Sequence, residues 1–436
     1  MIKKMEDIDI MKGLIEQNID SSKELIKNLN IYKGIVFSNK EYSFNYAGSR
    51  SCSVSKVIER AERSAKKLGI EEIVNITDID NLNIPVYSIT SKDKNKEINN
   101  YNNGKGFTLE QAKISAYMEF IERRAAGIDK KVNIFGSYNE LKEIYTSKIM
   151  SPSQLITYYK DYITENAKIG WSWAIDITEF YPILIPTVAV KYPFYDELIF
   201  MKNNSNGLAA GSSILEAIIQ GIYEVIERDC TSIAMAGGKY EDIDINSIDS
   251  EECKNLIKEF KKNYINIYIK NVTNDLGIPC FIVTGDDVKA KNSFYLSGGH
   301  GCHTQKDIAL MRALTELAQT IKTIKYGKRE DIVRMRKNGG EDYVEVKQRN
   351  IKWYSNSKFQ EDYSKIKSFK FDNMNDELNF LIELLKQKKH KIIVSDLTPN
   401  DSEVSVVRVI IPGLENWYDD RKRIGKRLYN AVMINK

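Results

Sequence analysis

Acidic side chains recur in this sequence at a spacing that could bind divalent cations. Three segments repeat one pattern: a small residue, a second small residue four positions later, a glutamate three further on, and a Glu or Gln three beyond that. The sets are Ala112, Ala116, Glu119 and Glu122; Ala217, Gly221, Glu224 and Glu227; and Ala309, Ala313, Glu316 and Gln319. On a helix, such positions fall within an arc of roughly 120°. Each segment therefore predicts a helix with one distinct face. The two small residues on this face allow close packing, and the two polar side chains follow them on the same face.

Paired carboxylates on a buried helix face indicate a bound cation. Without one, desolvated like charges repel each other and take up protons. Magnesium suits such a site, because it prefers oxygen ligands and is usually held by one or two carboxylates together with phosphate oxygens. The second copy is the richest, since the small-residue stretch 206–213 precedes Glu216, Glu224 and Glu227. The pattern therefore favours a magnesium–nucleotide site.

The nucleotide part of this prediction depends on the stretch 206–213 and on two arginines. Backbone N–H groups at a helix N-terminus bind phosphate oxygens well, and Arg228 or Arg312 could bind phosphate in a bidentate manner. The stretch is not a Walker A motif, because no G-x-x-x-x-G-K-[ST] occurs in the sequence. Taken singly, such a loop is more often a helix cap, and a single glutamate more often faces solvent. Their joint occurrence on helices with small-residue faces favours the functional interpretation.

The elements that position these groups repeat as well. Upstream of each acidic segment lie a threonine turn and an Ile-Pro pair that is predicted to open a strand. These are Thr77 with Ile84-Pro85, Thr178 with Ile185-Pro186, and Thr273 with Ile278-Pro279. A unit of β-hairpin, glycine loop and acidic helix thus recurs about every hundred residues, which is too long for an ordinary solenoid repeat. We interpret this as internal duplication, with a helix-less fourth echo at Thr398 and Ile411-Pro412.

The repeats define the predicted organisation of the chain. They span about 50–128, 169–240 and 264–325, after an N-terminal helical segment at 1–44. The polar stretch at about 327–372 is predicted to be an exposed insertion. No glycine- or proline-rich linker separates the repeats, so they should share one core. We expect one large mixed α/β domain at 45–436.

Composition excludes several classes of protein. The net charge of +4 over 436 residues gives no reason to expect a nucleic-acid partner. The five cysteines form no C-x-x-C pair, which argues against a disulfide framework or structural zinc. The sequence has no apolar run long enough to span a bilayer and no secretory signal. We therefore expect a cytoplasmic protein that does not bind membranes.

At these residues the sequence resembles the YcaO family, ATP-using enzymes that activate peptide backbone amides. The resemblance covers about 45–415, and its specific blocks are Gly104 to Arg123, Asn206 to Asp229, Arg312 to Gln319 and Arg408 to Gly413. It implies a YcaO-like fold with ATP and Mg²⁺ as cofactors. The residues that it implies as magnesium ligands are Glu119, Glu122, Glu216, Glu224 and Glu227. Arg228 and Arg312 are implied as nucleotide contacts, with Arg50 and Ser212 as further ones from a gapped alignment, and Glu224, Glu227 and Arg312 as catalytic.

The resemblance also implies a reaction. In the family, a nucleophile adds to an amide carbonyl and ATP phosphorylates the amide oxygen. Loss of phosphate then gives an azoline when the nucleophile is a neighbouring Cys, Ser or Thr, or a thioamide when it is external sulfide. This sequence lacks the proline-rich tail and the extra fused domain of many azoline-forming members. It therefore resembles most the stand-alone thioamidating branch, which in methanogenic archaea installs thioglycine in methyl-coenzyme M reductase.

The implied partners follow from that branch. They are the α subunit of methyl-coenzyme M reductase as protein substrate, sulfide or a sulfur-donor protein, a TfuA-like protein, and a second copy of the chain in a homodimer. Two alternatives stay open: an azoline-forming cyclodehydratase that acts on a ribosomal peptide, and a non-catalytic ATP-binding scaffold.

One compact cluster, His300-Gly301-Cys302-His303, lies outside these patterns. Its spacing differs from that of the usual zinc sites, so a structural loop or a substrate contact is favoured over a metal site. Cys302 as a persulfide carrier is a further hypothesis.

Overall fold

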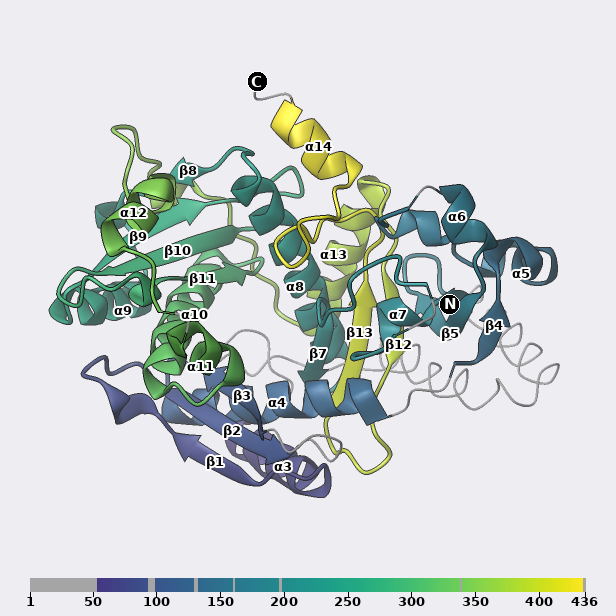
Figure 1. Ribbon diagram of the computed structural model, residues 1–436, viewed down its shortest axis with the longest axis horizontal. Helices are drawn as coiled ribbons and strands as arrows, with labels where there is room; N and C mark the ends of the chain where they lie inside the picture. The colour runs from purple at the N-terminus through teal and green to yellow at the C-terminus, as the bar shows by residue number, and fades with distance from the viewer. Residues whose placement is uncertain are drawn as a thin grey trace. The chain divides into compact units, whose positions relative to one another are not determined.

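The computed structural model describes residues 53–92, 99–128, 132–159, 161–195, 198–337 and 339–433. They form both helices and antiparallel sheets, which confirms the predicted mixed α/β class (Figure 1). Contacts divide them into two compact units: unit 1 comprises 121–238 and 371–433, and unit 2 comprises 53–120 and 239–370. The predicted N-terminal helical segment at 1–44, and Arg50, lie outside the described residues.

Unit 2 contains two sheets. The first has the order β1 (Glu72–Asn75), β2 (Val86–Lys92), β3 (Asn99–Lys105), and the second has the order β11 (Leu296–Cys302), β10 (Cys280–Asp287), β9 (Ile265–Asn271), β8 (Glu241–Asp242). Its helices are α3 (Val54–Lys67), the first part of α4 (Leu109–Ile128), α9 (Glu251–Lys262), α10 (Lys306–Tyr326), α11 (Glu330–Lys337) and α12 (Tyr343–Arg349). Short 3-10 helices are η1 (Thr77–Ile79), η4 (Ile245–Ser247), η5 (Ser293–Tyr295), η6 (Ile351–Trp353) and η7 (Tyr363–Lys365). Buried side chains such as Ile269, Phe281 and Leu314 build its core.

Unit 1 is built on one six-stranded sheet. Its path is β4 (Ile134–Gly136), β5 (Ile169–Asp176), β12 (Ile393–Asp396), β13 (Ser405–Ile410), β7 (Leu208–Gly211), and β6 (Tyr181–Pro186) pairs with β5. Helix α8 (Ile214–Met235) contacts β7, β13 and α13 (Met374–Gln387). The remaining helices are α5 (Tyr138–Tyr145), η2 (Thr146–Lys148), η3 (Pro152–Gln154), α6 (Asp161–Asn166), α7 (Thr187–Val190) and α14 (Lys426–Met433). All eight residues of β5 are buried, so the sheet lies in the core of this unit.

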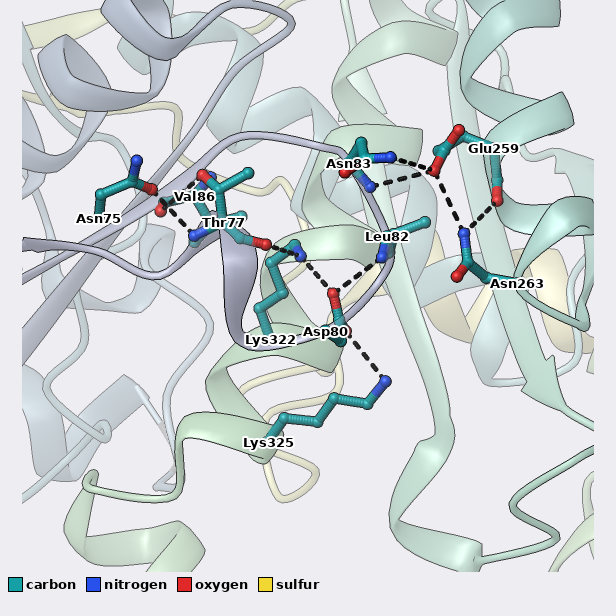
Figure 2. Close-up of polar contacts among 10 residues, drawn as sticks. All are labelled: Asn75, Thr77, Asp80, Leu82, Asn83, Val86, Glu259, Asn263, Lys322 and Lys325. Atoms are coloured by element: carbon teal, nitrogen blue, oxygen red, sulfur yellow. Dashed lines mark hydrogen bonds and ion pairs between the residues drawn. The ribbon is translucent and has the colours of Figure 1, made fainter.

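The threonine turns show that the duplication is structural. In each turn the threonine N–H donates to an Asn or Asp side chain two residues earlier. The pairs are Thr77 to Asn75 (2.9 Å), Thr178 to Asp176 (2.9 Å), Thr273 to Asn271 (3.0 Å) and Thr398 to Asp396 (2.8 Å). Each threonine hydroxyl oxygen then accepts a backbone N–H, from Val86 (3.2 Å), Ile392 (3.0 Å), Cys280 (3.1 Å) and Val406 (2.9 Å) respectively. Figure 2 shows the first copy. The turn at Thr398, which no acidic helix follows, therefore has the same hydrogen bonds as the other three turns.

Two details of the predicted repeat are wrong. Strands β2 and β10 begin directly after their Ile-Pro pairs, but β6 ends on Pro186 and α7 follows it. The β5–β6 hairpin pairs Asp176 with Tyr181, so the chain has already returned along the sheet before it reaches the proline. The predicted glycine loop is a strand in every copy, since Gly104, Gly211 and Gly299 lie in β3, β7 and β11.

These strand glycines explain the small residues on the helices. A Cβ atom on Gly104 would lie 2.0 Å from the Ala116 nitrogen, and one on Gly211 would lie 2.6 Å from the Ala217 nitrogen. A Cβ atom on Gly299 would lie 2.3 Å from the carbonyl oxygen of Ala313. Each helix therefore packs its stripe against strand backbone, as the pattern predicted.

Helix α10 is also fixed by a buried polar contact near its end. The ammonium group of Lys322, which is fully buried, donates to the carbonyl oxygen of Thr77 (2.6 Å) and to the Asp80 carboxylate. Lys325 binds the other oxygen of Asp80 at 2.9 Å (Figure 2). Two cations on one buried carboxylate lock α10 against the turn that follows β1.

The polar stretch at 327–372 is only partly exposed. Helix α11 is mostly exposed, but Trp353, Tyr363 and Ile366 are buried, and Tyr363 belongs to the core of unit 2. The prediction of an exposed insertion is therefore wrong for this second half, because scattered apolar side chains anchor it. Among the helices of the described ranges, none combines the length and the apolar character needed to cross a membrane.

Candidate functional site

Helix α8 carries three of the predicted glutamates. Its first turn is capped by Ser213, whose hydroxyl oxygen accepts the N–H of Glu216 at 3.3 Å. The Glu216 side chain is fully buried and accepts a hydrogen bond from the Ser212 hydroxyl. Glu224 and Glu227 follow in the middle of the helix, half-buried. Within the described chain, neither of these two carboxylates has a hydrogen bond or an ion pair to another residue.

The electrostatics of Glu224 favour a bound cation. Burial, and to a lesser extent the neighbouring carboxylate of Glu227, raise the pKa of Glu224 to about 7 against the opposing effect of Arg228 and Arg408. A carboxyl group with this pKa exchanges its proton near neutral pH. A divalent cation would take the place of that proton and neutralise both glutamates.

Arg228 is positioned by the segment that follows β13. Its guanidinium lies 5.3 Å from the centre of the Tyr418 ring. The Tyr418 N–H donates to the Ser232 hydroxyl at 3.0 Å, and the buried Asp229 accepts the Glu415 N–H at 2.8 Å. Asp229 also binds the Arg427 guanidinium through both of its oxygens, at 2.7 and 3.0 Å. Helix α8 therefore anchors residues 414–428, and this segment in turn holds Arg228.

Helix α4 contributes Glu122 to unit 1. One Glu122 carboxylate oxygen accepts the backbone N–H of Ala210 in β7 at 2.7 Å. This contact ties the acidic end of α4 to the stretch that precedes α8. Glu119 lies one turn earlier on α4 and, like Glu122, is half-buried.

Unit 2 contains the third copy of the pattern on α10, and there the polar side chains have partners within the protein. Glu316 pairs with Lys105 of β3, and its other oxygen lies 3.3 Å from the Nδ1 of His300. The Gln319 side chain donates to the carbonyl oxygen of Asn103 at 2.9 Å. Arg312 donates from Nη1 to the carbonyl oxygen of Cys302 at 2.9 Å. The third copy is thus satisfied by protein groups.

Most of the predicted site residues belong to unit 1. These are Glu122, Ser212, Glu216, Glu224, Glu227 and Arg228. Glu119 and Arg312 belong to unit 2, and Arg50 lies outside the described residues. No group of three or more His, Cys, Asp or Glu side chains in the described ranges could hold a metal ion by itself. The α8 pair still fits magnesium, which takes only one or two carboxylates when phosphate oxygens complete its shell.

The cluster at 300–303 is structural in the described chain. Cys302 lies in β11 opposite Cys280, and both side chains are fully buried. His303 is buried as well, and its Nδ1 accepts the N–H of Gln305 at 3.0 Å. The burial of Cys302 argues against a persulfide carrier, which must meet its sulfur donor.

Sequence reasoning assigned no site role to three polar residues near α8. Arg408 lies within electrostatic reach of Glu224, and Asn206 and Asn416 lie beside Arg408 around one cavity. A signal for Arg408 was present, because it is the single charged residue in the otherwise apolar strand Ser405–Ile410. Nothing in the local sequence marks Asn416.

Comparison with known proteins decides the family. The sequence profile described as YcaO cyclodehydratase, ATP- and Mg²⁺-binding, matches residues 103–415. The chain belongs to the YcaO family. An uncharacterized protein of Methanothermobacter thermautotrophicus is 30% identical over 374 residues, which is 84% of this chain and 94% of the relative. An uncharacterized protein from the tfuA 3′ region of Rhizobium leguminosarum is 27% identical over 277 residues, covering 61% of this chain and 65% of the relative.

Solved structures share the YcaO fold. The YcaO of Methanopyrus kandleri, bound with AMPPCP and Mg²⁺, has a TM-score of 0.73 at 22% identity and covers 89% of this chain and 98% of its own. A heterocyclase in complex with substrate and cofactor has a TM-score of 0.74 at 20% identity, covering 94% of this chain and 58% of its own. The predicted YcaO family, with ATP and Mg²⁺ as its ligands, is confirmed. The roles of individual residues stay predictions.

Proposed function

We propose that this YcaO protein is an ATP- and Mg²⁺-dependent enzyme that converts a backbone amide of a protein substrate into a thioamide. The observation that carries the proposal is the Glu224–Glu227 pair on α8. It combines half-buried carboxylates, no hydrogen-bond or ion-pair partner in the described chain, and a pKa of about 7 for Glu224. Such a pair is costly to keep unless a cation binds it.

The chain's own residues would act by positioning and by charge. Glu224 and Glu227, with Glu119, Glu122 and Glu216 as the other predicted ligands, would hold Mg²⁺. When bound, Mg²⁺ supplies the positive charge that stabilises a transferring phosphoryl group. Arg228, fixed by Tyr418, would bind phosphate oxygens. Ser212, Arg50 and Arg312 would contact the nucleotide.

The nucleophile and the partners are part of the same proposal. Sulfide, or a protein that donates it, would add to the amide carbonyl, and the substrate would be the α subunit of methyl-coenzyme M reductase, modified at a glycine. The similarity to proteins of Methanothermobacter and Methanopyrus supports this substrate. The relative from a tfuA region supports a TfuA-like partner. We further propose a cytoplasmic homodimer.

Azoline formation is the second candidate, because the matching family profile is described as a cyclodehydratase. The two reactions differ in product mass. Exchange of oxygen for sulfur raises the mass of the substrate, whereas cyclodehydration lowers it by one water.

The test uses the full chain with ATP, Mg²⁺, sodium sulfide and the purified α subunit of methyl-coenzyme M reductase. We expect phosphate release that depends on the substrate, and a peptide whose mass increases by the difference between sulfur and oxygen. Glu227→Gln should abolish both, and Glu383→Gln, which removes an exposed acid on α13 of the same unit, should change neither. Loss of water would establish the azoline reaction instead, and ATP binding without any turnover would establish a scaffold.

A further inference from the structure

A cavity of about 50 Å³ lies in unit 1 beside α8. Val225 of α8 and residues 408–414 form part of its wall. Its polar lining consists of Asn204, Asn206, Arg408, Asn416 and Arg423. Both charged residues in this lining are cations, and no Asp or Glu side chain lines it. The carboxyl groups of Glu224 and Asp419 interact electrostatically with Arg408.

Four buried polar atoms of this lining have no hydrogen-bond partner in the described chain. They are Nη1 of Arg408, Oδ1 of Asn206, and both amide atoms of Asn416. The rest of the Arg408 guanidinium is fixed, because Nε donates to the carbonyl oxygen of Ala189 (3.0 Å) and Nη2 to that of Asn204 (2.8 Å). Arg408 is 2% exposed and Asn416 is 3% exposed. Two almost completely buried side chains thus offer unused donors at one cavity.

Unpaired buried groups of this kind indicate an occupant. Each one left unsatisfied destabilises the folded chain, and proteins leave few of them. The cavity has room for roughly three to four waters, because one water needs about 10–15 Å³ measured in this way. A small polyatomic or sulfur anion fits the same space. The lining favours an anion over neutral water, because both of its charged side chains, Arg408 and Arg423, are cations.

We propose that this cavity binds one small inorganic anion through Arg408, Asn206 and Asn416. Two sources share this chemistry. One is hydrosulfide, the sulfur nucleophile, and the other is inorganic phosphate, the product of amide phosphorylation. The naming of these two sources rests on the proposed function, whereas the anion site itself rests on the cavity. Its position beside α8 would place the anion next to the carboxylate pair.

Calorimetric titration of the full chain tests the proposal. The titrants are sodium phosphate and, under anaerobic conditions, sodium hydrosulfide, each at constant ionic strength in sodium chloride. Mg²⁺ and AMPPCP are present at saturation, so that phosphate subsites of the nucleotide are filled. We expect one of the two anions to bind the wild type, and Asn416→Leu to weaken that binding at least about tenfold through the lost hydrogen bonds. The anion that binds identifies the source.

Matched variants separate binding from folding. Asn416→Leu removes an amide that has no protein partner, so its thermal midpoint without added anion should equal or exceed that of the wild type. Arg408→Lys should fold and bind the anion more weakly, because a lysine cannot reproduce the fixed guanidinium. Arg421→Gln removes a cation that stacks on Trp417, 4.9 Å away, and does not line the cavity, so it should bind like the wild type.

Equal affinity of the wild type and Asn416→Leu for both anions, or no binding of either, would overturn the proposal and leave the cavity to ordered water. This outcome differs from failure of the proposed function. If no thioamide forms but an anion binds in a manner that depends on Asn416, the site stands and only its source changes. If thioamide forms equally well in both proteins and no anion binding depends on Asn416, the site is wrong and the function stands.

Discussion

Helices α8 and α10 carry two copies of the same sequence pattern, and the polar side chains of the two copies have different surroundings. Both pack small residues against a glycine of the preceding strand, Gly211 for α8 and Gly299 for α10. On α10, Glu316 is neutralised by Lys105 and contacts His300. On α8, Glu224 and Glu227 have no such partners in the described chain. Duplication therefore preserved the packing geometry, while the charges diverged.

On this contrast we propose α8, rather than α10, as the copy that binds a cation. A carboxylate that is paired within the protein is already compensated, so its free energy changes little when a cation arrives. A carboxylate kept half-buried without a partner gains the most from one. Mutations on α8 and α10 test this contrast.

The first prediction concerns catalysis. Glu227→Gln should lower Mg²⁺-dependent ATP turnover about a thousandfold or more, because the magnesium that stabilises phosphoryl transfer loses a ligand. Glu316→Gln should lower it far less, because Glu316 is engaged by Lys105 and His300. Phosphate release at saturating substrate measures both, and circular dichroism checks that Glu227→Gln stays folded. Equal losses in the two variants would contradict the division of roles between α8 and α10.

The second prediction concerns the packing that both copies share. Gly299→Ala should destabilise unit 2 by about 3 kcal/mol, because its Cβ atom would lie 2.3 Å from a carbonyl oxygen of α10. Gly211→Ala should have a similar effect on unit 1. The matched control is Gly298→Ala, whose Cβ atom would meet nothing closer than 3.5 Å and should cost less than about 0.5 kcal/mol. Urea unfolding measures these changes, and a harmless Gly299→Ala would refute the close approach.

The parts that were predictable from sequence are those with a local pattern. The spacing of Ala217, Gly221, Glu224 and Glu227 indicates one helix face, because helical geometry fixes which residues share it. The threonine turns were visible, although the Asx partners two residues earlier were overlooked. The sequence predicts loops at the stretches that contain Gly104, Gly211 and Gly299, because glycine is common in turns. These stretches are strands instead. They need glycine because the backbone of the packed helix occupies the space that a side chain would fill.

The remaining features depend on contacts between distant segments. Glu316 is neutralised by Lys105, and nothing near Glu316 in the sequence reveals this partner. Asn416 reaches the cavity because Asp229 holds the chain at Glu415 and at Arg427. Tertiary contacts of this kind decide which of several similar carboxylates stays available, and local patterns do not contain them.

The third prediction uses pH to examine α8. The pKa of Glu224 is about 7 in the folded chain, against 4.5 for the free side chain. Because the folded state keeps the proton longer, this group favours folding below pH 4.5, and that contribution is lost as the pH rises through about 7. The shift corresponds to about 3 kcal/mol, which the partial exposure of Glu224 reduces to about 2 kcal/mol.

Denaturant unfolding without Mg²⁺ at pH 4.5 and 7.5 measures this effect. The stability of Glu224→Gln relative to the wild type should increase by that amount between the two pH values. Glu383→Gln, the exposed control on α13, should show no such change. A flat difference for Glu224→Gln would mean that burial does not raise the pKa of this carboxyl group in the folded chain.

The smallest predicted effect lies on α10. The side chains of Lys105 and Glu316 are 26% and 24% exposed, so water screens their pairing partly. A double-mutant cycle with Lys105→Met and Glu316→Gln should therefore give a coupling energy of about 1 kcal/mol. Urea unfolding measures the stability of each variant. The two single variants together should lose more stability than the double variant does, because each single variant leaves one charge unpaired. A coupling of zero would mean that Glu316 is as uncompensated as Glu224. The contrast between the two helices would then depend on Gln319 alone, whose amide donates to Asn103 where α8 keeps the acid Glu227.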